Sequence, residues 1–318
     1  MPLCSVTRSE QARYRATRTF PYRSLVLMHR RRFLFAAASA AGASLAARSA
    51  PGEHFEIIYP QIRPGRDVHA AFALATLDLA MKAANASYSA RQIELVMERG
   101  RALAELANGT TINLHWTSMD AQAERGLNVV HIPIHRGLIG YRVFLIRQDR
   151  QPDFDRIETL DDLRSMTGVQ GLGWIDTEIM RNAGLSVQTT SSYETIFKMV
   201  EGRRVDYFPR GVIEAYPEVE SRKETEPSLA VENRLLLAYR SDFLFYVSPN
   251  QERLAATIAR GFTAAWRDGS YLKLFNTHPY IQNALKRTNL ASRKIIRLDN
   301  PFLSDEDRAI PDMYWLHL

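Results

Sequence analysis

Short apolar segments alternate with amphipathic, helix-forming segments along most of this sequence. In the first half we expect strands at residues 55–59, 92–97 and 112–116. Helices are expected between them at residues 67–79 and 101–107, because apolar side chains recur there every three or four positions. Strands that alternate with helices predict an α/β fold, with helices flanking each sheet.

The alternation restarts after a polar connector at residues 148–153. Two long apolar strands, at 137–147 and 243–247, flank this second run, and a helical region at 251–275 follows. The pattern predicts two lobes joined by two crossing strands: a first lobe at 51–147, a second at 148–239, and a return to the first lobe at 240–318. A paired connection of this kind permits hinge closure around a ligand.

Positive charge is concentrated at the N-terminus. Residues 1–50 contain nine arginines and one acid, Glu10, giving +8, so the rest of the chain carries 6 − 8 = −2. This distribution excludes a nucleic-acid-binding body. Arg30-Arg31-Arg32 followed by Phe-Leu and an alanine-rich stretch resembles a twin-arginine export signal. A basic tail or an organelle transit peptide is the alternative. We expect cleavage within residues 46–50 and a periplasmic mature protein.

Two further expectations concern the N-terminal leader. Met28 precedes the arginine run closely and is an alternative start. Cys4, the only cysteine, lies inside the leader, so the mature chain is expected to have no disulfide, no thiolate nucleophile and no lipid-anchor cysteine.

Local phrases in the two halves resemble the family 3 solute-binding proteins of amino-acid-type ABC importers, which have the type II periplasmic binding fold. The phrases are residues 101–109, 123–125, 159–163, 202–206, 250–254 and 266–269. The resemblance covers nearly all of residues 53–300. It implies a monomer that captures a small polar, carboxylate-bearing solute and presents it to a membrane permease.

Two arginines are candidates for anion binding. The resemblance implies that Arg125 grips a ligand carboxylate, for which a guanidinium is well shaped. The alternative is a solvated arginine paired with Glu124 or Asp120. Arg210 stands where the family usually has an acid for the ligand ammonium. If Arg210 faces the cleft, an anionic ligand is expected; otherwise it is a surface arginine.

The turn at residues 171–177 occupies the family's second anion-binding position, and it leads into a helix whose N-terminus attracts negative charge. Asp176 and Thr177 belong to this turn, with Asp176 as an N-cap in the alternative interpretation. Trp174 either stacks on the ligand or fills the core. Tyr59, Trp116 and Thr117 end strands, where α/β sheets bind ligands. Tyr59 and Trp116 belong either to the cleft wall or to the core.

Tyr141 flanks the crossing strand and either faces the cleft or braces the hinge. No Walker loop, Gly-x-Ser-x-Gly elbow or zinc-hydrolase motif occurs, so neither a cofactor nor a catalytic residue is predicted. His131 and His135 stand four apart, but Pro133 between them argues against a shared metal. Two alternatives to a transport receptor stay open: a dehydratase-like enzyme, with Asp176 or Glu214 as its acid, and a ligand-sensing protein.

Overall fold

A computed structural model describes residues 53–318. The expected export signal, its cleavage region, Cys4 and Met28 lie outside these residues. None of the helices in the described part of the chain is long and apolar enough to cross a membrane.

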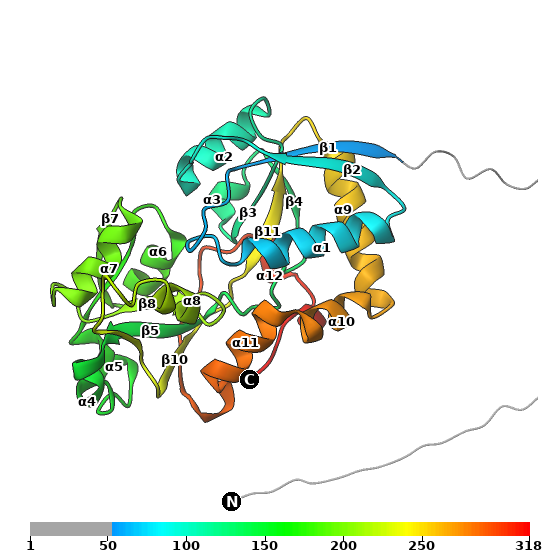
Figure 1. Cartoon of the computed structure of the whole chain (residues 1–318). Coiled ribbons are helices and arrows are strands. Elements are labelled where there is room, and N and C mark those ends of the chain that lie inside the picture. The colour runs from blue at the N-terminus through cyan, green and yellow to red at the C-terminus, as the bar shows by residue number, and fades with distance from the viewer. Residues whose placement is uncertain (1–52) are drawn as a thin grey trace, which may run out of the picture. The chain divides into compact units, whose positions relative to one another are not determined.

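The first lobe contains two small sheets covered by helices (Figure 1). One sheet is the parallel pair β1 (His54–Tyr59) and β2 (Ser87–Gln92), and the other is antiparallel with the order β3 (Leu114–Ser118), β11 (Phe243–Val247), β4 (Asn128–Val130). The helices are α1 (Ala70–Ala83), α2 (Arg99–Asn108), α3 (Ala121–Glu124) and α9 (Glu252–Arg267).

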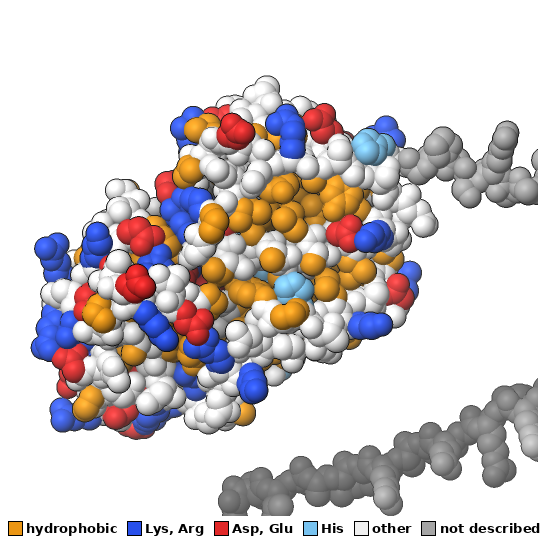
Figure 2. All heavy atoms as spheres, in the orientation of Figure 1, with side chains coloured by type: hydrophobic (Ala, Val, Ile, Leu, Met, Phe, Trp, Pro, Cys, Tyr) orange, Lys and Arg blue, Asp and Glu red, His pale blue; other side chains and the backbone are white. Residues whose placement is uncertain are grey.

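Helices α1 and α9 pack in close contact at a glycine. A Cβ atom built on Gly261 would lie only 1.8 Å from the carbonyl oxygen of Ala80. Only glycine therefore permits this backbone approach. In the view of Figure 2, a hydrophobic area covers α1, whereas acidic and basic side chains are interspersed over the second lobe.

The second lobe contains a mixed sheet with the order β12–β10–β5–β8, in which β9 also pairs with β5, and a parallel pair, β6 and β7. Its strands are β5 (Tyr141–Arg147), β6 (Thr167–Gly171), β7 (Ser186–Thr190), β8 (Phe208–Gly211), β9 (Leu229–Val231), β10 (Leu235–Ala238) and β12 (Lys294–Arg297). Its helices are α4 (Gln151–Phe154), α5 (Leu160–Arg164), α6 (Ile175–Asn182), α7 (Tyr193–Glu201) and α8 (Ala215–Glu220). The C-terminal part adds α10 (Ser270–Thr277), α11 (Pro279–Thr288) and α12 (Asp305–Arg308).

The chain passes between the lobes at two adjacent places. Strand β5 follows the first passage and belongs to the second sheet, so the change of lobe precedes Tyr141 rather than following Arg147. The return runs from β10 to β11. The two passages touch at Gly140, where a Cβ atom would lie 2.1 Å from the carbonyl oxygen of Tyr239.

The C-terminal residues contact both lobes. Strand β12 pairs with β10 of the second sheet. Further on, Asp307 of α12 contacts His131 beside β4 of the first lobe. The return segment at 240–318 therefore contributes to both lobes, whereas the sequence predicted only the first.

One strand lies earlier than expected. The apolar segment at 92–97 is a loop, and the strand is the preceding polar segment, β2. β2 pairs only with β1 and is mostly exposed, so its side chains do not need to be apolar. In this loop Met97 packs into the core of the first lobe, whereas Leu95 and Val96 are exposed.

Candidate functional site

A cavity of about 130 Å³ lies between the two lobes. The first lobe contributes Arg63, Arg66, Asp67, His69, Met97, Arg99, His115, Trp116, Thr117, Ser118 and Phe243. The second lobe contributes Arg142, Trp174, Ile175, Asp176, Tyr193, Arg210 and Glu214. Both walls therefore carry positive and negative side chains.

On the second lobe, two buried arginines are held by carboxylates. Arg142 of β5 donates to Asp176 Oδ1 at 2.5 Å, and its Nη1 lies 3.5 Å from Glu214 Oε2. Arg210 of the neighbouring strand β8 donates to Glu214 at 2.8 Å and to Glu218 at 2.5 Å. Strands β5 and β8 are paired, which brings the two guanidinium groups to the same acids.

The charges of this wall nearly cancel. Arg142 and Arg210 line the cavity with the acids Asp176 and Glu214, giving 2 − 2 = 0. A third acid, Glu218, pairs with Arg210 but does not line the cavity. Burial opposes the ionisation of Glu214, but Arg210 and Arg142 outweigh it and lower its pKa. Burial raises the pKa of Glu218, although Arg210 acts in the opposite direction. Arg210 is therefore a neutralised, structural cation.

The first-lobe wall is also balanced. Its three arginines pair with three carboxylates, so the sum is 3 − 3 = 0. Of these acids Asp67 lines the cavity, whereas Glu98 and Asp120 pair with the arginines from outside its lining. The pairs are Arg63 with Asp67 (3.3 Å), Arg63 with Glu98 (3.2 Å), Arg66 with Glu98 (2.5 Å) and Arg99 with Asp120 (2.9 Å). Arg99 also donates to Thr117 Oγ1 at 3.1 Å. These partners fix the arginine side chains in place around the cavity.

Three close approaches cross the cavity between the lobes. The guanidinium of Arg66 lies 4.5 Å from the ring centre of Tyr193, which is a cation–π distance. Arg99 Nη1 donates to the carbonyl oxygen of Gly173 at 3.4 Å. His69 Nδ1 lies 4.0 Å from Glu214 Oε1. The lobes are therefore in a closed arrangement.

The two histidines of the cavity are neutral at pH 7. Burial lowers the pKa of His69 to about 4, although Glu214 acts in the opposite direction. Burial, followed by the charge of Arg99, lowers the pKa of His115 to about 3. Each ring therefore offers the cavity one donor and one acceptor and no charge.

Comparison with known proteins identifies the fold. Neither a protein-family model nor a curated protein matches the chain. Among solved structures, a histidine kinase sensor domain with similarity to periplasmic binding proteins has a TM-score of 0.51 at 13% identity, covering 70% of this chain and 95% of its own. An ancestral arginine-binding protein bound to arginine has a TM-score of 0.50 at 13% identity, covering 71% and 98%. The chain has a two-lobed periplasmic-binding-protein fold. The fold class expected from the sequence is thus confirmed.

Five of the nine predicted ligand-binding residues line the cavity of this binding-protein fold: Trp116, Thr117, Trp174, Asp176 and Arg210. Glu214, the other candidate acid of the enzyme alternative, lines it too. Asp176 neither caps α6 nor leaves its charge free, because it holds Arg142 and accepts the hydroxyl of Tyr239. Trp174 packs beside Tyr193 and Phe208, with the guanidinium of Arg210 5.3 Å from its ring centre. It fills the wall and faces the cavity at once.

Four other candidates lie elsewhere. Arg125 is exposed at the C-terminal end of α3, because this helix is only four residues long and ends there. Tyr59 packs against the ring of Trp116. Tyr141 donates its hydroxyl to the Leu316 carbonyl at 2.6 Å, in a separate hollow. Thr177 is buried in the first turn of α6 and does not line the cavity.

Sequence reasoning missed the residues that shape the charge of the cavity, above all Arg99, Arg142 and His69. Arg142 had a visible signal, since it is a lone cation inside an apolar strand that is otherwise buried. Arg99 and His69 lie in segments whose sequence resembles an ordinary solvated loop or helix start. Their roles follow from pairing across the fold, which a linear pattern does not reveal.

Proposed function

We propose that this protein captures a small zwitterionic solute, carrying one carboxylate and one cationic group, between its two lobes. The observation that supports this most directly is the electrical balance of the cavity, where each wall carries paired charges of both signs. A solute with a net charge would leave part of that charge uncompensated in a buried site, which is unfavourable.

The charge balance changes the ligand expected from the sequence. The sequence predicted an anionic ligand on the condition that two unpaired arginines, Arg125 and Arg210, face the cleft. In the structure Arg210 is enclosed by Glu214 and Glu218. Arg125 does not line the cavity. A solute whose own charges cancel fits such walls better. A carboxylate on the solute stays part of the proposal.

We assign the solute carboxylate to Arg99. The Nη1 of Arg99 reaches only the Gly173 carbonyl, at a long 3.4 Å, and an ionised carboxylate is a stronger acceptor than a carbonyl. The hydroxyls of Thr117 and Ser118 lie in the same wall. We assign the cationic group of the solute to Asp67. Both hydrogen bonds that residues 53–318 make to its carboxylate go to Oδ2, from the backbone N–H and the guanidinium of Arg63. Oδ1 is therefore the oxygen that we expect to accept from the solute.

The size of the cavity limits the solute. A cavity of roughly 150 Å³ accommodates benzene, which has six non-hydrogen atoms. The 130 Å³ here corresponds to a molecule of similar size, such as alanine or serine. The ancestral arginine-binding protein of the same fold was solved with arginine and with glutamine, which are larger. We therefore expect a smaller amino acid or a close analogue.

Binding without catalysis is the function we favour. A dehydratase acid has to be protonated, whereas Arg210 and Arg142 lower the pKa of Glu214, one of the two candidate acids. Export through the twin-arginine route, a periplasmic location, a monomeric state and delivery to an ABC permease complete the proposal. They rest on the leader and on the local phrases quoted above.

Isothermal titration tests the proposal. Wild type is titrated with glycine, alanine and serine, and in parallel with arginine, glutamine and succinate. We expect binding of the small zwitterions, at least tenfold weaker binding in Arg99→Gln, and unchanged binding in the control Arg125→Gln. Equal binding by wild type and Arg99→Gln, or a preference for succinate, would refute the assignment.

A further inference from the structure

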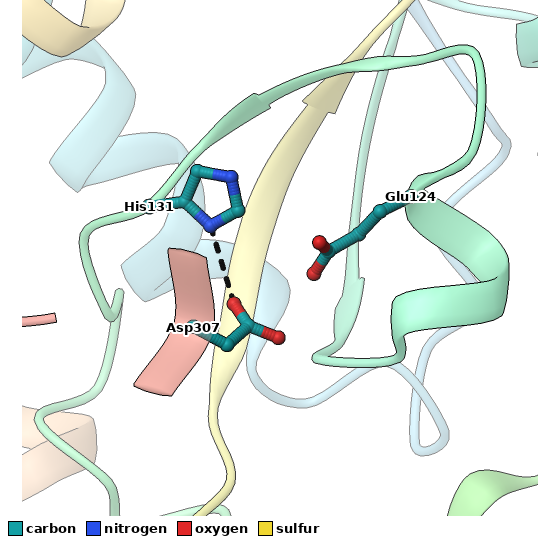
Figure 3. A group of neighbouring side chains, drawn as sticks. All are labelled: Glu124, His131 and Asp307. Atoms are coloured by element: carbon teal, nitrogen blue, oxygen red, sulfur yellow. Dashed lines mark hydrogen bonds and ion pairs between the residues drawn. The ribbon is translucent and has the colours of Figure 1, made fainter. Parts of the chain in front are cut away.

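Away from the cavity, three side chains with metal-binding atoms converge on the first lobe (Figure 3). Glu124 is the last residue of α3, His131 follows β4, and Asp307 belongs to α12. One ligand atom of each lies within 4.8 Å of the other two, and His131 Nδ1 is 3.2 Å from Asp307 Oδ1. Figure 3 shows the two carboxylates pointing toward each other, with the imidazole beside Asp307.

The two carboxylates are only partly paired, and their partner is a histidine. Asp307 is fully buried and its Oδ2 has no hydrogen-bond partner, and Glu124 Oε1 is likewise buried without a partner. Within residues 53–318, no lysine or arginine lies within ion-pair distance of either acid, and His131 is the sole salt-bridge partner of Asp307. Buried charges are normally paired or bound to a metal.

We propose that Glu124, His131 and Asp307 bind a divalent transition-metal cation, for which Zn²⁺ is the natural probe. Zinc ligands lie about 2.0–2.2 Å from the ion, so tetrahedral ligand atoms are about 3.4 Å apart. The 3.2 Å between His131 and Asp307 already matches this spacing. The Glu124 ligand atom lies within 4.8 Å of the other two, so it has to approach by at most about 4.8 − 3.4 = 1.4 Å, which its half-buried side chain permits.

The ligand set selects the type of ion. One imidazole with two carboxylates suits Zn²⁺ and neighbouring transition metals, whereas Ca²⁺ and Mg²⁺ prefer oxygen alone. The His131 side chain is 28% exposed, which leaves an opening through which the ion enters and a water completes the coordination.

The site would link distant parts of the chain. His131 and Asp307 are 176 residues apart, and α12 follows β12 of the second lobe. A metal held between them would therefore fasten the C-terminal segment to the first lobe. Because a bound ion stabilises only the folded state, its binding is measured as resistance to unfolding. This role does not depend on the solute proposed for the cavity.

Thermal unfolding of the full chain after chelator treatment, with and without ZnCl₂, tests the site. The variants are Glu124→Gln and Asp307→Asn, and the matched control is Glu306→Gln, an exposed acid on the same helix. At free Zn²⁺ a hundredfold above Kd, we expect the wild-type Tm to rise by about 5 °C or more. The control should respond equally, and both ligand variants should bind Zn²⁺ at least tenfold more weakly. Zinc binding elsewhere on the chain is common to all four proteins and cancels in the comparison.

Two further readouts keep the test decisive. Glu124→Gln without metal should be at least as stable as metal-free wild type, because it removes an unpaired charge; this holds even if Asp307→Asn fails to fold. Co²⁺ should give d–d absorption bands in wild type and in the control that are lost in Glu124→Gln. The absence of a Zn²⁺ response in wild type, or an equal response in Glu124→Gln, would overturn the proposal.

Discussion

Removing the guanidinium of Arg210 should destabilise the protein strongly. In Arg210→Met, Glu214 and Glu218 lose the cation that lies 2.8 and 2.5 Å from them, while both remain buried. Breaking a buried ion pair by removing one partner costs about 3–5 kcal/mol. At roughly 2–4 °C per kcal/mol for a domain of this size, Tm should fall by about 6–20 °C.

The loss should depend on pH in a defined direction. Without Arg210 the pKa values of Glu214 and Glu218 rise above their unfolded values. The folded state then retains protons that the unfolded state releases, so stability falls as pH rises through 4.5 and upward. Urea unfolding at pH 5 and pH 8 measures this, with exposed Arg125→Met as the control. A free-energy loss below about 1 kcal/mol at pH 8, or a larger loss at pH 5, would refute the account of this network.

Two other predictions concern packing and pH. Gly261→Ala should lower the free energy of unfolding in urea by about 1–3 kcal/mol, because its Cβ would lie 1.8 Å from the Ala80 carbonyl oxygen. The control Gly100→Ala, in α2 with open space around it, should not lower this free energy. An equal effect of the two changes would contradict the α1–α9 contact. The unfolding free energy should fall as pH drops from 6.5 to 4. Burial lowers the pKa of His69 to about 4, so between these two pH values only the unfolded chain binds a proton at this ring. In His69→Gln the loss of unfolding free energy between pH 6.5 and pH 4 should be smaller by up to about 3 kcal/mol. The same loss in His69→Gln and wild type would show that the ring is accessible to solvent.

Apolar and amphipathic segments were predictable because their patterns are local. The strand Phe243–Val247 has the bounds that its apolar pattern predicts. Strand β2 was misplaced because an exposed edge strand carries no apolar pattern. Strand β12 was missed: it is a four-residue strand at the edge of the sheet, defined by its pairing with β10.

The residues of the site likewise fall into those with a local sequence signal and those that only long-range contacts bring together. Thr117 and Trp174 were found because they follow a strand or precede a helix, where α/β folds bind ligands. Arg125 was misplaced because a single short turn, α3, decides which way it faces. The partners of Arg210 and the cluster around Asp307 depend on residues far apart in sequence, so only the folded chain brings them together.

Closure of the two lobes on a solute is the central claim, and a distance across the cleft tests it most directly. Val96 and Leu172 are 50% and 66% exposed on the first and second lobe, beside the cavity residues Met97 and Trp174. Spin labels on Val96→Cys and Leu172→Cys, with Cys4→Ser removing the only native cysteine, report the separation by electron-spin resonance. Saturating alanine or serine should shorten and narrow the distance distribution, and adding Arg99→Gln should abolish that response. An identical distribution with and without every solute of the panel would contradict the proposed capture.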